Sequence, residues 1–293
     1  MIKRKQIVAT GLAAPEGPAV LPGRGIVFVE QMRGRISLYD GTKVEVISES
    51  PGSPNAVIVG SDGNLYAAQN GGIVGDWRSS PRTKPGIQRI ALDGSVEYVC
   101  SEVGGIPTKA PNDLVFGADG RLYFTDPAEG YNQAARTECG RLFVLDDNGG
   151  ELLLDVGCSY PNGLAFMVDG RLVWVETYER EVCVLESGKR HKLCQLPKNH
   201  LPDGLDVAED GRLFITTVTS HGITVLSPEG EVLDLLYLDD EALPTNCCFD
   251  GDVLWVTDFS VGWVDEHTTG RLWRIETDAV GKQQKPGMLK LRQ

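Results

Sequence analysis

Short alternating runs of apolar residues recur along the whole chain, and the clearest of them follow an Asp-Gly pair. These runs are residues 65–67, 122–124, 172–174 and 213–215, which follow Asp62-Gly63, Asp119-Gly120, Asp169-Gly170 and Asp210-Gly211. Asp-Gly between alternating segments predicts a tight hairpin, because glycine accepts the positive φ of such turns. No segment keeps a helical period beyond one or two turns, so the pattern predicts an all-β protein.

A second phrase, which begins with proline, places these runs in a repeat. It reads Pro15-Glu16-Gly17, Pro54-Asn55-Ala56, Pro111-Asn112-Asp113, Pro161-Asn162-Gly163, Pro202-Asp203-Gly204 and Pro244-Thr245-Asn246, at intervals of 39 to 57 residues. In the middle four units the Asp-Gly pair lies eight residues after the proline, and two further strand-like runs follow it. Four short antiparallel strands in each unit predict a six-bladed β-propeller, formed as one domain by residues 1–293.

The two ends of the chain compete for one place in this ring. Residues 6–10 resemble the last strand of the other units. We expect them to complete the sixth blade beside residues 271–275, because this closure removes exposed strand edges. Residues 288–291 are the competing candidate for that outer strand. The additional length in residues 73–86 and 127–139 predicts insertions on one face, where such loops often cover a site.

The residue after each proline carries the candidate chemistry. Because the first strand of a blade lines the central channel, equivalent positions predict one ring of side chains at one height. The ring consists of Glu16, Asn55, Asn112, Asn162, Asp203 and Thr245. Two carboxylates in a narrow channel are costly without a counter-charge, and Ca²⁺ prefers carboxylate and amide oxygens. The ring therefore predicts a divalent cation on the axis, and the capping of turns and strand ends is the alternative role for these residues.

Charge and cysteine content narrow the class of function. The formal net charge is -13, which disfavours nucleic acid and anionic membranes as partners. Seven cysteines without a CxxC pair indicate reduced thiols that fill the core of a cytoplasmic protein. The apolar stretch near the N-terminus is too short for a signal peptide, and no apolar run is long enough to predict a membrane span. No serine-hydrolase elbow, P-loop or dinucleotide-binding pattern is present.

Five phrases together resemble the gluconolactonase/regucalcin (senescence marker protein) family of six-bladed β-propellers, over essentially the full length of the chain. They are Pro15-Glu16-Gly17-Pro18, Ala110-Pro111-Asn112-Asp113-Leu114, Phe124-Thr125-Asp126-Pro127, Pro161-Asn162-Gly163-Leu164 and Pro202-Asp203-Gly204-Leu205. The resemblance implies a lactonase in which Glu16, Asn162 and Asp203 hold one divalent metal ion. It also implies that Asn112 contacts substrate or metal, and that Asp203 is the general base.

One position departs from the family pattern. Many relatives carry an arginine two residues before the Asn of the third phrase, and that arginine is tied to sugar-type substrates. This chain has Ala110 at that position, with Lys109 adjacent. Candidate substrate contacts are Asn112, Asn55, Lys109 and Tyr131, and the loop aromatics Trp77 and Tyr178 are candidates for the pocket wall. Asp126 is either a turn cap or a ligand of a second, structural ion.

These observations predict metal-dependent hydrolysis of a small lactone or related ester. The metal would polarise the carbonyl as a Lewis acid, and Asp203 would activate water or attack the carbonyl directly. Ca²⁺ fits the oxygen ligands best, and Mg²⁺, Mn²⁺ and Zn²⁺ stay open. The alternatives are a paraoxonase-like arylesterase or phosphotriesterase, a non-catalytic calcium-binding propeller, and a condensing enzyme similar to strictosidine synthase, which works without metal.

Overall fold

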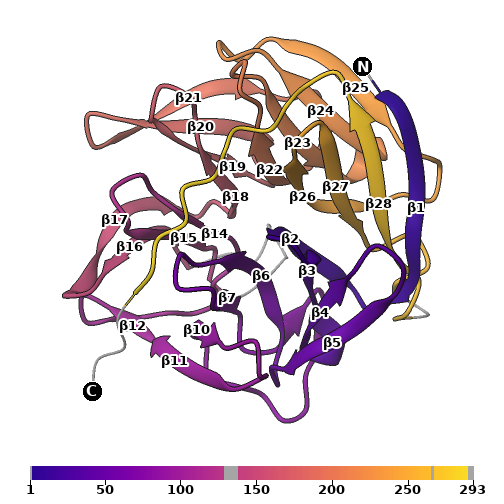
Figure 1. The fold of residues 1–293 in the computed structure, drawn as a ribbon. Helices are drawn as coiled ribbons and strands as arrows, with labels where there is room; N and C mark the ends of the chain where they lie inside the picture. Colours follow the sequence, from indigo (N-terminus) through magenta and orange to yellow (C-terminus); the bar gives the residue numbers. More distant parts are fainter. Residues whose placement is uncertain (1, 129–137, 265–266, 290–293) are drawn as a thin grey trace.

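The computed structural model describes residues 2–128, 138–264 and 267–289. Within these residues the chain forms six four-stranded antiparallel sheets arranged around a central axis (Figure 1). Each sheet is one blade, and its first strand lies nearest the axis. The predicted six-bladed β-propeller is therefore confirmed.

The first three blades follow one another in sequence. Blade 1 is β2 (Pro15–Leu21), β3 (Gly25–Glu30), β4 (Arg35–Tyr39) and β5 (Val44–Glu49); blade 2 is β6 (Pro54–Val59), β7 (Leu65–Gln69), β10 (Gly86–Ile90) and β11 (Val96–Cys100); blade 3 is β14 (Leu114–Phe116), β15 (Leu122–Asp126), β16 (Gly140–Asp146) and β17 (Gly149–Gly157). Two short hairpins lie outside the blades, β8 (Ile73–Val74) with β9 (Trp77–Arg78) and β12 (Glu102–Val103) with β13 (Ile106–Pro107). The first hairpin belongs to the predicted insertion at residues 73–86.

The last three blades repeat the arrangement. Blade 4 is β18 (Pro161–Phe166), β19 (Leu172–Glu176), β20 (Glu181–Glu186) and β21 (Lys189–Gln195); blade 5 is β22 (Pro202–Val207), β23 (Leu213–Thr217), β24 (Gly222–Leu226) and β25 (Val232–Tyr237); blade 6 is β26 (Pro244–Asp250), β27 (Val253–Asp258), β28 (Gly270–Thr277) and β1 (Ile2–Leu12). Single 3₁₀ turns follow β3 and β23, η1 (Gln31–Arg33) and η3 (Val218–Ser220). In the described residues no helix is long and apolar enough to cross a bilayer. The cytoplasmic location stays a prediction.

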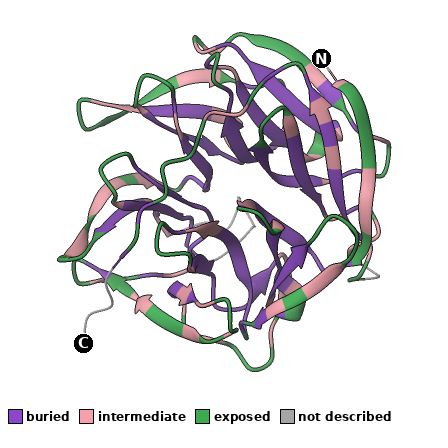
Figure 2. Cartoon of the chain, in the orientation of Figure 1, coloured by how far each residue is buried: buried purple, intermediate pink, exposed green. Residues whose placement is uncertain are grey.

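The apolar core is divided into six clusters, one between each pair of neighbouring blades. Alternate residues of a strand pack into different clusters. In β3, Val27 and Val29 pack toward blade 2, whereas Ile26 and Phe28 pack toward blade 6. Both faces of a sheet are thus covered, which is why the second strands read as nearly continuous apolar runs. Figure 2 shows the consequence, buried strands near the axis and exposure along the outermost strands.

The Asp-Gly pairs form the predicted tight turns between the first and second strands. Gly63, Gly120, Gly170 and Gly211 all have positive φ, from 76° to 89°. In blade 3 the Asp119 carboxylate accepts the backbone N–H of Arg121 at 3.1 Å and its guanidinium Nε at 2.7 Å. The same pair of bonds links Asp210 to Arg212. Local turn chemistry therefore fixes where each inner strand ends.

The N-terminal strand closes the ring, as predicted. β1 pairs antiparallel with β28, with Lys5 opposite Ile275 and Ile7 opposite Trp273. Of the competing C-terminal run, Met288 and Leu289 lie outside any strand and residues 290–293 lie outside the described residues. The outer strand of blade 6 is therefore β1.

The C-terminal segment, residues 280–289, instead crosses one face of the propeller, as the yellow trace in Figure 1 shows. Its Lys282 N–H donates to Val207 O in blade 5 (2.8 Å). At its far end the Leu289 N–H donates to the Tyr66 hydroxyl in blade 2 (3.0 Å). A cavity of about 880 Å³ lies beneath this strap and is lined by residues of the inner strands, among them Asp113, Asp206 and Asn246.

Candidate active site

Five of the six inner strands have an irregularity where the candidate side chains emerge. Each begins with its proline opposite the last residue of the second strand, as Pro15 lies opposite Glu30 and Pro161 opposite Glu176. The register then shifts within three residues, also in β6, β22 and β26. A β-bulge re-aims the side chains that it contains. The Pro phrases therefore mark the points where residues turn toward the channel.

Glycine at the third position of the phrase lets neighbouring inner strands approach closely. A Cβ on Gly163 would lie 2.6 Å from Asp203 O and 2.6 Å from the Gly204 Cα. At Gly204 it would meet the Asn246 side chain at 2.1 Å. The narrow part of the channel thus requires residues without a side chain beside the candidate ligands.

Gly163→Ala is expected to destabilise the fold by ~3 kcal/mol, because neither backbone contact yields without moving a strand. Urea unfolding measures this loss. Gly170→Ala is the matched control in the same blade: its φ is +89° and no atom lies within 4 Å of the added Cβ, so only ~1 kcal/mol of backbone strain is expected. Equal losses for the two variants would contradict the close-approach account.

Polar residues at the ends of the second strands hold the loops that lead into the Pro phrases. The carboxylate of Asp126 accepts the backbone N–H groups of Lys109 (2.8 Å), Ala110 (2.8 Å) and Ala128 (3.0 Å). Glu30 and Asp258 make the same kind of bond, to Ala13 N and Leu243 N. Asp126 is therefore a turn cap, the first of its two predicted roles. A polar residue at the end of each apolar second strand is thus a further repeat. It is visible in the sequence, but the sequence analysis did not identify it.

The ring residues lie in the channel with one exception. Glu16, Asn55, Asn112 and Asn162 are buried, and Asp203 has intermediate exposure. The exception is Thr245, whose hydroxyl bonds to Pro15 O (3.0 Å) and to Thr257 between blades 6 and 1. The prediction that Thr245 joins the ring is therefore wrong, because its short side chain is used in packing two blades together.

Two channel residues that the sequence reasoning missed are Asp113 and Asn246, each one position later in its phrase. The Asn246 amide donates to the Asp113 carboxylate at 3.3 Å, a contact between blade 6 and blade 3 on opposite sides of the axis. Asp113 is buried, and burial raises its pKa to about 6. One sequence feature could have identified these two residues. Asp113 and Asn246 stand where three of the other phrases have glycine.

Glu16 and Asp203 are close enough for their charges to interact. Burial raises the pKa of Glu16 well above its usual range, and the charges of Asp203 and Asp113 raise it further. Burial likewise raises the pKa of Asp203 to about 8, although a hydrogen bond from Asn162 opposes the shift. Among the described residues no Lys or Arg forms an ion pair with either carboxylate. The channel therefore brings acidic groups together without a protein cation to balance their ionised forms.

The amides of blades 2 and 3 line a small pocket of about 10 Å³, with Ala110 and Tyr160. The Asn55 Oδ1 accepts hydrogen bonds from Gln31 (3.0 Å) and Asn70 (3.3 Å). In contrast, the Oδ1 of Asn112 is buried and has no partner within the described part of the chain. A buried acceptor without a partner is costly, so Asn112 is poised for a ligand.

The remaining candidates are Lys109, Tyr178, Trp77 and Tyr131. The Lys109 Nζ reaches Glu138 at 3.4 Å and is part of a half-exposed ion pair. The Tyr178 ring packs edge-on against Tyr160, a residue of the pocket lining, at 5.4 Å between centroids, and Trp77 lies in β9. Tyr131 lies outside the described residues.

Residues 14–260 match the model of the SMP-30/Gluconolactonase/LRE-like region, which is most of the chain. The chain belongs to this family. A gluconolactonase of Zymomonas mobilis is 29% identical in an alignment of 220 residues that covers 68% of this chain and 58% of that protein. The match thus spans less than two thirds of the relative's own length.

Solved structures with the same fold support the architecture of this family member. A gluconolactonase from Xanthomonas campestris superposes with a TM-score of 0.73 at 23% identity, over 93% of this chain and 89% of that one. A calcium-binding protein, regucalcin, from Agrobacterium tumefaciens superposes with a TM-score of 0.78 at 16% identity, over 99% of this chain and 98% of that one.

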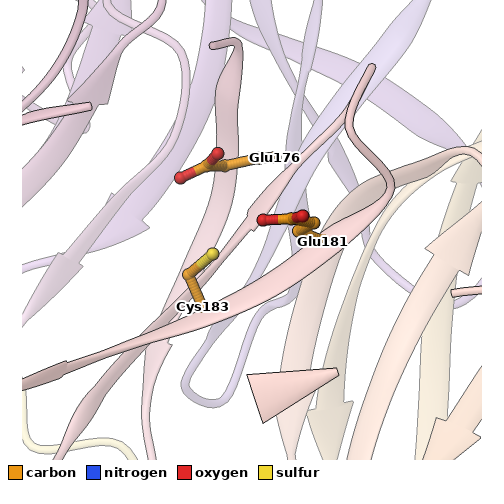
Figure 3. A group of neighbouring side chains, drawn as sticks. All are labelled: Glu176, Glu181 and Cys183. Atoms are coloured by element: carbon orange, nitrogen blue, oxygen red, sulfur yellow. The ribbon is translucent and has the colours of Figure 1, made fainter. Parts of the chain in front are cut away.

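A second acidic group in this family member lies away from the channel. Figure 3 shows Glu176, Glu181 and Cys183 on β19 and β20, with ligand atoms within 4.8 Å of one another. Arg190 already neutralises this group: its guanidinium bonds to both oxygens of Glu176 (2.7 and 2.9 Å) and to Glu181 (2.5 Å). Lys192 adds a second cation at 2.8 Å from Glu181. Protein cations thus occupy the place of a metal ion here, and the group is a salt-bridge network.

Arg190→Leu is expected to destabilise the protein by ~3–5 kcal/mol, because it leaves the buried Glu176 carboxylate without its cation. Urea unfolding checks this value. Lys192→Met is the control, since Lys192 is half-exposed and an exposed pair contributes ~1 kcal/mol or less. If added Ca²⁺ restored the stability of Arg190→Leu, the group would be a metal site after all.

Proposed function

We propose that this family member hydrolyses a small lactone with a divalent metal ion held in the channel. The observation that carries the proposal is that the carboxyl groups of Glu16 and Asp203 interact in the channel, where no Lys or Arg of the described residues pairs with them. Asn162 forms a hydrogen bond with Asp203. Carboxylates in such a place are costly unless a cation offsets them. The gluconolactonase relative supports the choice of a lactone as the substrate class.

The residues present fit a hard cation. Glu16 and Asp203 supply carboxylate oxygens, Asn162 an amide oxygen, and the Asn112 Oδ1 is a buried acceptor whose partner is otherwise missing among the described residues. We propose these four residues as the ligands. Oxygen donors favour Ca²⁺, and Mg²⁺, Mn²⁺ and Zn²⁺ are the other candidates.

The chemistry divides between the ion and the chain. When bound, the ion supplies Lewis-acid polarisation of the lactone carbonyl. Asp203 accepts the proton of the attacking water as the water oxygen bonds to the carbonyl carbon. The ring C–O bond then breaks, and Asp203 returns the proton to the leaving alkoxide, which gives the open-chain hydroxy acid. Asn112 and Asn55 would orient the substrate, and Lys109 and Tyr131 are further proposed substrate contacts.

The test is hydrolysis of several sugar lactones by chelator-treated protein, titrated in turn with Ca²⁺, Mg²⁺, Mn²⁺ and Zn²⁺. Activity is expected to vanish with chelator and to return with metal. Glu16→Gln should weaken metal affinity, whereas Glu181→Gln, in the Arg190 network, should not. An aryl ester and a phosphotriester in the same panel identify the paraoxonase-like alternative. Full activity in the presence of chelator would refute the proposal.

A further inference from the structure

Two cysteines lie at the open end of one hairpin in blade 3, on the face that carries the candidate site. β16 and β17 pair antiparallel, and Gly140 lies opposite Gly157. Cys139 immediately precedes Gly140, and Cys158 immediately follows Gly157. The next cross-strand position beyond this glycine pair therefore brings Cys139 opposite Cys158, on the same side of the sheet.

Cross-strand spacing suits a disulfide. Directly opposed residues have Cα atoms roughly 4.5–5.5 Å apart, within the ~4.4–6.8 Å that a disulfide spans. Their Cβ atoms need to approach by about 1 Å, which the end of a hairpin permits because no further ladder bonds hold it. The two thiols are also close enough to interact. The charge of Asp155 is the main cause that raises the pKa of Cys139, and the neighbouring Cys158 raises it further.

Cys158 is more accessible than the other six cysteines. All seven cysteines are free, and Cys183, Cys247 and Cys248 are buried, as predicted for core residues. Cys158 is exposed and Cys139 half-buried, so the prediction that every cysteine fills the core is wrong for Cys158. An exposed thiol beside a second thiol is open to oxidants that the core cysteines never meet.

We propose that Cys139 and Cys158 form a reversible dithiol–disulfide pair at the open end of the β16–β17 hairpin. The reaction partner is a low-molecular-weight disulfide such as oxidised glutathione. The Cys158 thiolate attacks one sulfur of that disulfide and releases one thiol. The Cys139 thiolate then attacks the Cys158 sulfur and releases the second thiol, so two protein thiols are oxidised and one disulfide is reduced to two thiols.

The bond would join two loops that reach the candidate site. Cys139 follows Glu138, whose carboxylate pairs with Lys109 at 3.4 Å. Cys158 precedes Ser159, whose hydroxyl donates to Glu176 at 2.7 Å, and Asn162 follows a few residues later. The proposal rests on the hairpin register and stands whether or not the protein is a lactonase.

The test treats the full chain with oxidised glutathione and counts thiols in denaturant with dithiobis(nitrobenzoate). The count should fall from seven to five and return to seven with dithiothreitol. Trypsin cuts after Arg141, between the two cysteines, so mass spectrometry should show the peptides of Cys139 and Cys158 linked. Cys139→Ser should instead keep one glutathionyl group on Cys158.

Cys194→Ser is the matched control, since Cys194 is another half-buried thiol in an outer strand. Its count should fall from six to four with the same linked peptides. Wild-type protein that keeps seven thiols, links other cysteines, or accumulates a stable glutathionyl group on Cys158 without closing the bond would overturn the proposal.

Discussion

Asp203→Asn is expected to reduce kcat/KM for lactone hydrolysis by about 10²–10⁴-fold, the usual contribution of a general base. The asparagine keeps the size of the side chain and an oxygen toward the channel, but it accepts no proton at neutral pH. Burial raises the pKa of Asp203 to about 8 in the chain alone. A bound cation would lower that pKa and keep the carboxylate ionised, so activity should need both the metal and the carboxylate.

Initial rates at saturating Ca²⁺ measure this effect, and Ca²⁺ titration of the variant separates lost affinity from lost proton transfer. Asp234→Asn is the control, because Asp234 lies in the same blade but is exposed on β25. The role of Asp203 as base would be abandoned if the variant at saturating metal kept more than a tenth of the wild-type rate.

The second large effect concerns stability without metal, which is expected to fall as pH rises from about 4 to 8. Burial raises the pKa of Asp203 from its ordinary 3.8 to about 8 in the folded chain. Between these values the folded chain binds the extra proton, so raising the pH favours unfolding. The loss for Asp203 alone is on the order of 5 kcal/mol, and Glu16 and Asp113 shift in the same direction.

A divalent ion should reverse this loss. At a hundredfold excess over its Kd, Ca²⁺ adds ~2.7 kcal/mol at pH 8, and much less at pH 5, where the carboxyls are protonated. Thermal unfolding at both pH values, with chelator and with Ca²⁺, measures the difference in Tm. In the Glu16→Gln, Asp203→Asn double variant, Tm should depend much less on pH and on Ca²⁺. A wild-type Tm that is flat with pH and unmoved by Ca²⁺ would contradict the metal site.

The repeat phrases predicted the positions of most candidate site residues because local backbone and turn preferences set where each inner strand begins and ends. Proline starts the inner strand, the next side chain turns into the channel, and Asp-Gly ends the strand at a fixed distance. These steps depend on φ preferences and turn chemistry, which act over a few residues. The spacing of the phrases is therefore enough to predict Glu16, Asn162 and Asp203 on one ring.

Where the prediction failed, a contact between distant segments decided the outcome. Thr245 follows its proline as Asp203 does, yet its hydroxyl bonds to Pro15 O in the neighbouring blade. Asn246 takes the channel position and reaches Asp113, a residue 133 positions away. No spacing in the chain reports such a pairing, because it depends on how six blades close into a ring.

The chain by itself determined the blade count and the strand that closes the ring, and it predicted most of the residues that we propose as ligands, since each follows from short-range periodicity and turn residues. Only the tertiary structure decided which acidic groups lack a counter-charge. Glu176 and Glu16 are both buried glutamates near a repeat position, but Arg190 neutralises Glu176 while Glu16 faces Asp203 and Asp113 across the axis. The difference arises from the cation that the fold brings beside each carboxylate, and that arrangement separates a structural salt bridge from a candidate metal site.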